Sequence, residues 1–345
     1  LAGLLSAIQL LCTLLITWFY SRLNRRREVP VMPRVLDEYV RTPRGWRQHL
    51  MVGGILVILG LLLITPLVAL GIRSFTRLEA ARGERGEVNT GWTLTYYREL
   101  FINRRGSLFY VPPIEAVRNS LNYASLTVVI SLGLGLLAAV ALNRQKSKTH
   151  NHLSEFQRVL YGRTDQLNHS RIFLPLGELF LMLPLGASAV TLGLGFLVAF
   201  NRLPLDVRTF PFLIPVAHSL VALPFVVRTL QPVLASIPPV LRNAAAVLGA
   251  SPWHVWKEID LPIVFRAMVS SGVFAFTISM GEFGATTFLA RPEYPTLPVA
   301  IYRFLSQPGA LNYGQALAMA TLLMLICAVG IFVIERLRLP GGEGL

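Results

Sequence analysis

The stretch that decides the fold covers Pro239–Pro262 and reads PVLRNAAAVLGASPWHVWKEIDLP. It is a polar interruption between two long apolar runs. Residues 240–248 are rich in alanine, which favours a helix, and Gly249 provides the C-terminal cap of that helix. Ser251 then caps a second helix, in which Pro252 takes the first position, where its missing N–H costs nothing. The stretch therefore predicts two short helices joined by a turn at a glycine.

The second predicted helix carries two tryptophans, Trp253 and Trp256, which lie one turn apart on the same face. We expect Leu261–Pro262 to end this helix before the next apolar run begins. One arm of the resulting knob has small side chains and the other has aromatic ones. A compact knob of this kind suits docking into a groove on another protein, and the alternative is an ordinary helical hairpin between two spans.

The composition predicts an all-α integral membrane protein. Of the 345 residues, 53% are hydrophobic and 14% are charged, whereas soluble domains carry about 25% charged residues. The net charge of +14 comes from basic residues beside apolar runs, where they orient spans and contact anionic lipid, so it does not indicate a nucleic-acid partner. Cys12 and Cys327 both lie in apolar runs, which indicates neither a disulfide framework nor a thiolate metal site.

Seven apolar runs approach the length of about 20 residues that a bilayer requires. We predict a polytopic helical bundle with spans at 1–20, 50–72, 117–142, 172–200, 210–230, 263–289 and 314–334. Pro175 and Pro184 are expected to break the span at 172–200. Basic residues concentrate in the segments after the first and third spans, so the positive-inside rule makes those segments cytoplasmic. Alternation of the spans then places the knob and the C-terminus in the cytoplasm too.

The knob resembles the "EAA" loop of binding-protein-dependent ABC importer permeases, the type I group with a MetI-like transmembrane domain. The family pattern is Glu-Ala-Ala, three residues, Gly, nine residues and Ile-x-Leu-Pro. In this sequence the pattern falls on Asn243, Ala244, Ala245, Gly249, Ile259, Leu261 and Pro262. One position departs from it, because Asn243 stands where the family has its glutamate. An ion pair made by that glutamate is therefore absent here or made elsewhere.

Further pieces of the chain are similar to the iron(III) and thiamine permease branch of this family. They are Arg118-Asn119-Ser120-Leu121, Leu183-Pro184-Leu185-Gly186, Leu192-Gly193-Leu194-Gly195, Ala222-Leu223-Pro224-Phe225-Val226-Val227-Arg228 and Gly281-Glu282-Phe283-Gly284-Ala285, the last also similar to molybdate permeases. Permeases of this branch are often two fused halves of six spans each. On this resemblance, the chain is the C-terminal half of such a protein.

The same resemblance divides the chain into domains. Residues 1–20 are expected to be the last span of a missing first half, and 21–49 a basic cytoplasmic linker. A type-1 transmembrane domain at 50–338 follows, with its coupling loop at 239–262 and a tail at 339–345.

The resemblance implies the permease subunit of an ATP-driven importer that works by alternating access in the cytoplasmic (inner) membrane, within the lipid bilayer. The implied partners are a cytoplasmic ABC ATPase dimer, an extracytoplasmic solute-binding protein and a second permease half or subunit. The substrate it suggests first is iron(III), and thiamine is second. Coupling to the ATPase falls on the motif residues with Trp253 and Trp256 as contacts. The chain contains no Gly-x-x-x-x-Gly-Lys-Ser/Thr phosphate loop, so ATP hydrolysis is expected on a separate subunit and no cofactor is expected.

Three side chains inside apolar runs are candidates for the translocation path. An ionisable group within a span indicates function, which singles out Glu282 and Glu178. The alternative for Glu282 is an ion pair with an arginine or a place near the outer headgroups. His218 is the histidine well inside a span, and its alternative is a hydrogen bond to a neighbouring helix. A metal site at His150, His152 and His169 is not favoured, because the loop lacks a carboxylate arrangement.

Two other classes of protein remain open from the sequence. An ion-coupled secondary transporter would need no ATPase, and it should show broken helices in an inverted repeat, which is not visible. A membrane-embedded enzyme would need clustered polar catalytic groups within its spans, and these are sparse.

Overall fold

The computed structural model describes residues 45–77, 91–103, 111–151, 181–200 and 212–337, together with positions 4, 8, 9, 11, 12, 15, 16 and 19. Throughout these residues the regular structure is helical, and the β-type pairing within them is a single isolated bridge between Thr76 and Trp92. The predicted all-α fold is confirmed.

Five helices of the described part are long and apolar enough to cross a membrane. They are α2 (Trp46–Phe75), α4 (Pro113–Asn151), α8 (Leu213–Ser236), the continuous helix that ends in α11 (Leu261–Gly281), and α14 (Ala310–Leu337). These helices match the predicted spans at 50–72, 117–142, 210–230 and 314–334 and part of the span at 263–289. The span predicted at 1–20 lies mostly outside the described residues.

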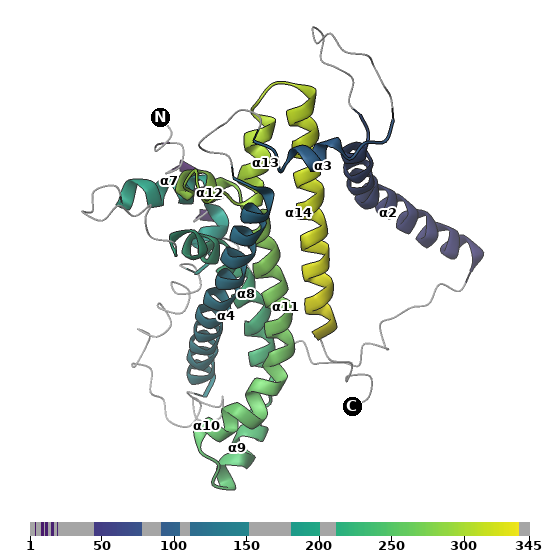
Figure 1. Cartoon of the computed structure of the whole chain (residues 1–345). Coiled ribbons are helices and arrows are strands. Elements are labelled where there is room, and N and C mark those ends of the chain that lie inside the picture. The colour runs from purple at the N-terminus through teal and green to yellow at the C-terminus, as the bar shows by residue number, and fades with distance from the viewer. Residues whose placement is uncertain are drawn as a thin grey trace.

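Helices α4, α8 and α11 form the centre of the bundle (Figure 1), and α14 packs beside α11. A small residue lets α4 and α8 come close together. A Cβ added at Gly135 of α4 would lie 2.5 Å from the side chain of Val226 in α8, so only glycine fits there. Buried Val226, Leu230 and Val264 form an apolar core between these helices. The short helix α13 (Leu297–Leu305) packs on α14 and α4 at the end of the bundle far from the predicted knob.

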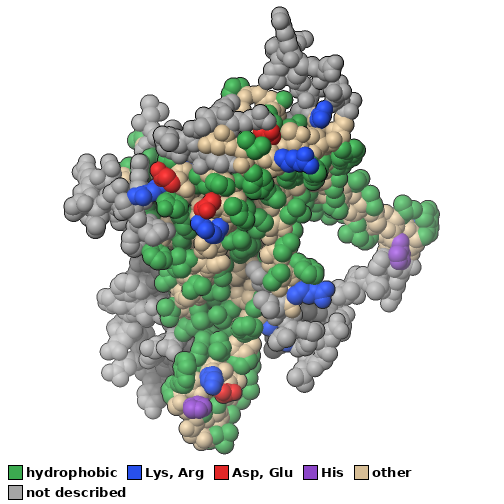
Figure 2. Space-filling model, viewed as in Figure 1, with side chains coloured by type: hydrophobic (Ala, Val, Ile, Leu, Met, Phe, Trp, Pro, Cys, Tyr) green, Lys and Arg blue, Asp and Glu red, His purple; other side chains and the backbone are tan. Residues whose placement is uncertain are grey.

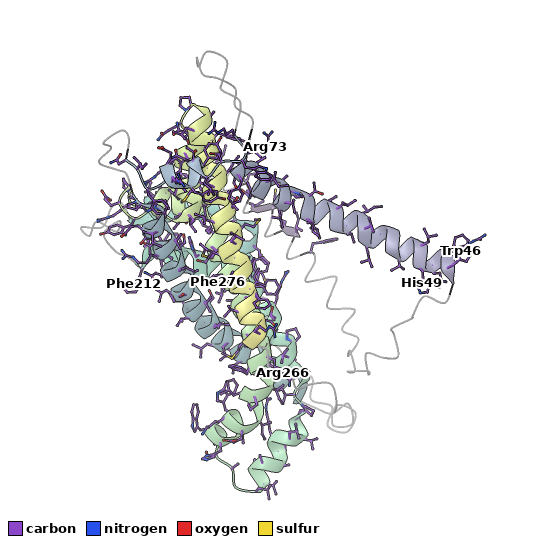
Figure 3. All side chains as sticks on the ribbon, turned by 45° about the vertical axis from the view of Figure 1, so that its right-hand side comes forward. Trp46, His49, Arg73, Phe212, Arg266 and Phe276 are labelled. Atoms are coloured by element: carbon purple, nitrogen blue, oxygen red, sulfur yellow. The ribbon has the colours of Figure 1, made fainter. Side chains whose placement is uncertain are left out.

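Helix α2 leans away from this bundle, as Figures 1 and 3 show from two sides. It meets α14 and the short helix α3 (Thr95–Glu99) near its Arg73 end, while its Trp46 end stands apart. Ser74 bonds the hydroxyl of Tyr97 at 2.8 Å, and Phe75 stacks on the same ring. The apolar side chains along the rest of α2 are exposed, so this helix presents an apolar surface to its surroundings.

Two predicted spans are broken helices. A break is expected in the span at 172–200, at Pro175 and Pro184, whereas the break in the span at 263–289 is a correction. The apolar run at 263–289 predicts one helix, but α11 ends at Gly281 and Glu282 is extended with φ −73° and ψ 114°. Helix α12 (Gly284–Leu289) then begins as a separate element. Of the run at 172–200, the structure describes a helix at 181–186, a break at Ala187–Ser188, and α7 (Ala189–Phe200).

A further correction concerns Leu261–Pro262, which do not end a helix. The chain continues from α10 (Pro252–Val255) through a π-helical turn, Trp256–Asp260, directly into α11. In this turn Leu261 donates to the carbonyl of Trp256. A proline in a regular helix clashes with the carbonyl four residues earlier. Because the π turn is wider than an α turn, it allows the helix to pass through Pro262.

Candidate functional site

The knob at 239–262 has the glycine turn that the sequence predicts. Helix α9 (Pro239–Val247) ends in a Schellman motif, in which Gly249 donates to the carbonyl of Ala246 and Ala250 donates to that of Ala245, both at 3.0 Å. Gly249 has φ +82°, a conformation that other residues rarely adopt. A Cβ at Gly249 would meet no atom within 4 Å, so the requirement for glycine comes from the backbone and not from crowding.

The second arm begins at the predicted cap. The hydroxyl of Ser251 accepts a hydrogen bond from the backbone N–H of His254 at 3.4 Å, and Pro252 follows at the first helical position. The arm then continues through the π turn into α11, so one side of the knob is rigidly connected to a helix that crosses the membrane.

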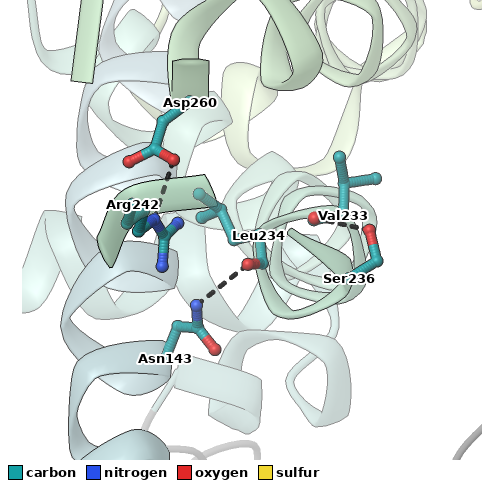
Figure 4. A network of polar contacts seen from close by, with 6 residues as sticks. All are labelled: Asn143, Val233, Leu234, Ser236, Arg242 and Asp260. Atoms are coloured by element: carbon teal, nitrogen blue, oxygen red, sulfur yellow. Dashed lines mark hydrogen bonds and ion pairs between the residues drawn. The ribbon is translucent and has the colours of Figure 1, made fainter. Parts of the chain in front are cut away.

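An ion pair closes the knob across its base (Figure 4). The Nε of Arg242, on α9, donates to Oδ1 of Asp260, at the end of the π turn, over 2.8 Å. The carboxylate of Asp260 is mostly buried. Beside this pair, Asn143 in the C-terminal part of α4 donates to the carbonyl of Leu234 at 3.1 Å. The ion pair joins the two arms of the knob, and the Asn143 bond joins α4 to the end of α8 just before the knob begins.

The knob carries exposed apolar side chains beside a histidine and a few charged ones (Figure 2). Val247 and Leu248 at its tip are each 88% exposed, and Trp253 is 67% exposed. Trp256, by contrast, packs inward on the core cluster that contains Leu234 and Ile237. The two tryptophans predicted as joint contacts therefore have different surroundings.

The remaining motif residues are distributed in the same way. Asn243, Ala244 and Pro262 are exposed, and Gly249 lies at the exposed turn. Half-buried positions are Ala245, Ile259 and Leu261.

The other candidate region is where the two broken spans meet. Helices α7 and α12 pack against each other (Figure 1) through positions where only glycine fits. A Cβ at Gly193 would lie 2.6 Å from the backbone of Ala285, and one at Gly284 would lie 2.9 Å from the backbone nitrogen of Val190. Two interrupted apolar segments in contact are typical of substrate sites in transporters, because their ends leave backbone groups available to line a path.

Glu282 lies at this break and is 9% exposed. Its Oε1 accepts the backbone N–H of Ala285 at 2.9 Å, so the carboxylate caps the first turn of α12. Among the described residues, Glu282 makes no salt bridge, so the alternative of an arginine partner is not seen within this part of the chain. Glu178 lies outside the described residues.

His218 is 1% exposed and bonds hydroxyls on both sides of the break. Its Nδ1 lies 2.8 Å from Oγ of Ser279, in α11, and its Nε2 lies 2.7 Å from Oγ1 of Thr286, in α12. The predicted alternative, a hydrogen bond to a neighbouring helix, describes this geometry. No group of three potential ligands that could hold a metal ion occurs among the described residues.

Several contacts in these two regions cannot be predicted from local sequence patterns. Arg242 and Asp260 are 18 positions apart, and no local pattern pairs them. The partners of His218 are 61 and 68 positions away. Only the fold brings such side chains together.

Comparison with known proteins identifies relatives for most of the chain, although no family model matches it. A protein of Salmonella paratyphi A that carries the name of the 2-aminoethylphosphonate transport system permease PhnV is 30% identical over 229 residues, which cover 66% of this chain and 76% of that protein. The spermidine/putrescine transport system permease PotC of Escherichia coli is 25% identical over 297 residues, or 86% of this chain and 98% of PotC.

A solved structure supports the same fold. It is that of a bacterial ABC transporter involved in the import of the acidic polysaccharide alginate, with a TM-score of 0.58 at 16% identity, covering 86% of this chain and 96% of that one. The membrane-length helices, the fold and the extent of the match to the Salmonella protein agree, and the chain belongs to the family of ABC transport system permeases.

Proposed function

We propose that this chain is the permease subunit of an ATP-driven importer in the cytoplasmic membrane, and that the knob at 239–262 docks into a cytoplasmic ATPase. The observation that carries this proposal is the exposed apolar tip of a rigid knob, which projects from the bundle at the end opposite α12 and α13 (Figure 1). An exposed apolar patch on such a protrusion is typical of a surface that binds another protein.

The knob residues have separate roles in this proposal. Asn243, Ala244 and Trp253 face the ATPase, while Trp256, Ile259 and Leu261 hold the knob to the bundle. Gly249 sets the angle of the tip, and Pro262 sits where the knob passes into α11. The Arg242–Asp260 pair makes the knob rigid, so that a movement of the ATPase is passed on to the membrane helices.

The two breaks supply the candidate translocation path. Glu282 and His218 lie at the junction of α11 and α12, and we place Glu178 on the same path from the sequence. In alternating access, closure of an ATPase dimer on ATP draws the knobs of two permease halves together and opens the path to a loaded solute-binding protein. Hydrolysis reverses the movement. The exposed apolar surface of α2 remains available to lipid and to the second permease half.

Orientation follows from the docking role. If the ATPase binds the knob, the knob and the C-terminus lie in the cytoplasm, and α12 and α13 lie toward the solute-binding protein. The positive-inside rule supports the same arrangement.

The substrate proposed first is a phosphonate such as 2-aminoethylphosphonate. The relative that is 30% identical over 76% of its own length carries the name of a permease for this compound. The resemblance noted in the sequence suggests iron(III) and then thiamine, and neither occurs in the names of the relatives described above. Both are therefore included as competitors in the test.

Photo-crosslinking in cells that express the complete transporter tests the docking role. A photoreactive amino acid at Leu248, which is 88% exposed at the tip of the knob, should capture the ATPase subunit. The matched control is Leu137 of α4, which is 69% exposed on the membrane-spanning part and should capture none. If neither position captures the ATPase in cells that transport normally, the docking role is contradicted.

Uptake of labelled 2-aminoethylphosphonate by the same cells tests the substrate. We expect saturable uptake that excess unlabelled 2-aminoethylphosphonate abolishes and that iron(III), thiamine and spermidine leave unchanged. Inhibition by iron(III) or thiamine, without inhibition by the phosphonate, would replace the proposed substrate.

A further inference from the structure

His218 connects three helices through its two ring nitrogens. It lies on α8, Ser279 lies near the end of α11, and Thr286 lies in α12. Ser279 and Thr286 stand on opposite sides of the break at Glu282–Phe283. A single buried side chain from a neighbouring helix therefore bonds both halves of the interrupted span.

The hydroxyl of Thr286 belongs to two hydrogen bonds. Besides its contact with His218, it lies 3.0 Å from the carbonyl oxygen of Glu282. In a neutral imidazole one nitrogen donates and the other accepts. If Nε2 carries the proton, Thr286 accepts from the ring and donates to the Glu282 carbonyl. If Nδ1 carries it, Thr286 donates to the ring and its bond to the break is lost. The state of the histidine is thus linked to a carbonyl at the break itself.

The network continues from Ser279 to α4. Its hydroxyl lies 3.3 Å from Oγ1 of Thr127, to which it donates when Nδ1 of His218 carries the ring proton. Thr127 in turn donates to the carbonyl of Pro215 at 3.4 Å. Every member of this chain is buried, so water does not compete for these bonds. Buried polar networks whose members are all bonded hold a single arrangement of the elements that they join.

The His218–Ser279 bond joins α8 to α11, and these two helices also flank the knob. Helix α8 ends at Ser236, and α9 begins three residues later at Pro239. On the other side, α10 and the π turn lead without interruption into α11. Helix α12 has no such direct connection, because the break at Glu282–Phe283 separates it from α11. Ala285 and Leu289 of α12 pack on Ala217 and its neighbours in α8, and the bond to His218 adds a directional polar connection to this helix, which leads to the knob.

We propose that His218 is a positioning residue for transport: its bond to Thr286 makes α12 follow α8 when the knob moves. This proposal rests on the proposed function, since it assigns the means by which movement of the docked knob reaches the break. Because α12 packs on α7 through Gly193 and Ala285, the second broken span moves with it.

Two substitutions at His218 separate its two bonds. The side-chain amide of glutamine reaches the position of Nε2, so His218→Gln keeps the bond to Thr286 and loses the one to Ser279. The amide of asparagine reaches the position of Nδ1, so His218→Asn keeps the bond to Ser279 and loses the one to Thr286. The test measures ATP-driven uptake of labelled 2-aminoethylphosphonate, and ATP hydrolysis, by the complete transporter in proteoliposomes. We expect His218→Gln to transport nearly as well as the wild type.

The expected result for His218→Asn is a loss of uptake of about tenfold while ATP hydrolysis continues, because a coupling of this kind typically amounts to a factor of about 5–150. A side chain that only stabilised the fold would lower uptake and hydrolysis together and would not distinguish the two amides. Equal losses in the two variants, or normal uptake by His218→Asn, would overturn the proposal.

Two neighbouring threonines provide a second test that leaves His218 intact. Thr286→Val removes the hydroxyl that bonds the histidine and preserves the shape of the side chain, so it should reproduce the uncoupling. Thr287→Val is the matched control, since the hydroxyl of Thr287 is exposed and bonds only the local carbonyl of Phe283 at 2.7 Å among the described residues. Loss of uptake in Thr287→Val equal to that in Thr286→Val would contradict the proposal.

The failure of the proposed function has a different signature. If the wild-type transporter shows no ATP-driven uptake, the function itself is not that proposed. If the wild type transports and the two amides behave alike, only the role of His218 is refuted.

Discussion

The two ends of the bundle are held together by different kinds of contact. At the tip of the knob, the bonds that set the turn are local: Gly249 and Ala250 bond carbonyls three and five residues earlier, and Ser251 caps its own helix. At the break between α11 and α12, the bonds join distant parts of the chain, as in the contacts of His218 with Ser279 and Thr286.

This difference matches what each end has to do. A docking knob keeps one shape while its partner moves, and local bonds keep that shape wherever the knob is carried. A gate has to change its arrangement relative to other helices, and contacts between helices can change without unfolding any one of them. The comparison therefore predicts that changes at the tip of the knob alter its docking, whereas changes at the break alter how the helices pack and move with one another.

The largest effect is expected at Gly249. Valine at φ +82° is strongly disfavoured, so Gly249→Val should displace the tip and reduce ATP-driven uptake in cells to background with normal membrane insertion. Asparagine tolerates this backbone conformation and is of similar bulk, so Gly249→Asn is the matched control and should retain most uptake. Equal loss in both variants would attribute the effect to bulk at the interface and not to the shape of the knob.

The next effect separates the two tryptophans. Trp256→Ala removes an inward side chain from the core cluster and should lower the free energy of unfolding by about 3 kcal/mol, measured by thermal denaturation in detergent. Trp253→Ala removes an exposed side chain, so it should leave the melting temperature unchanged and weaken crosslinking of the ATPase. The reverse pattern would show that Trp256, and not Trp253, contacts the ATPase.

A smaller effect is expected where α7 meets α12. Gly193→Ala forces a methyl group against the backbone of Ala285, and overpacking of this kind costs about 1–3 kcal/mol. Gly195→Ala, two positions along the same helix, places its methyl group where no atom lies within 4 Å and serves as the control. We expect a lower melting temperature for the first variant alone. Equal stability of the two variants would mean that α7 and α12 do not pack this closely.

The smallest effect concerns the ion pair at the base of the knob. Because the Arg242 side chain is 34% exposed and water screens its charge, Arg242→Ala should lower the free energy of unfolding by only about 1 kcal/mol. Its coupling with Asp260→Ala in a double-mutant cycle should be measurable. Lys257→Ala, in the exposed Lys257–Glu258 pair with its atoms 3.9 Å apart, is the control and should change nothing measurable. If the cycle shows no coupling between Arg242 and Asp260, this ion pair does not contribute to the rigidity of the knob.

The same contrast explains what the sequence could predict. The glycine turn and the serine cap follow from residues next to one another, and the structure has both. The sequence predicts that Pro262 stops a helix, but the π turn before it depends on contacts that are not local: Asp260 pairs with Arg242 of α9, and Trp256 packs on the core of the bundle.

The length and apolar character of the run at 263–289 predict one helix, and Glu282 between two glycines did not by itself indicate that the helix ends there. The sequence marked His218 and Glu282 as unusual side chains in apolar surroundings. It gave no information on Ser279 and Thr286, because hydroxyl residues in a membrane helix commonly bond their own backbone. Only the packing of α8 against α11 and α12 turns these two hydroxyls toward the histidine.

The most direct test of the central claim is solute uptake by proteoliposomes that contain this permease, with and without its ATPase and solute-binding partners. The account predicts uptake only when the ATPase, the solute-binding protein and ATP are all present. Uptake by the permease without ATP, driven by an ion gradient, would contradict it and indicate an ion-coupled secondary transporter.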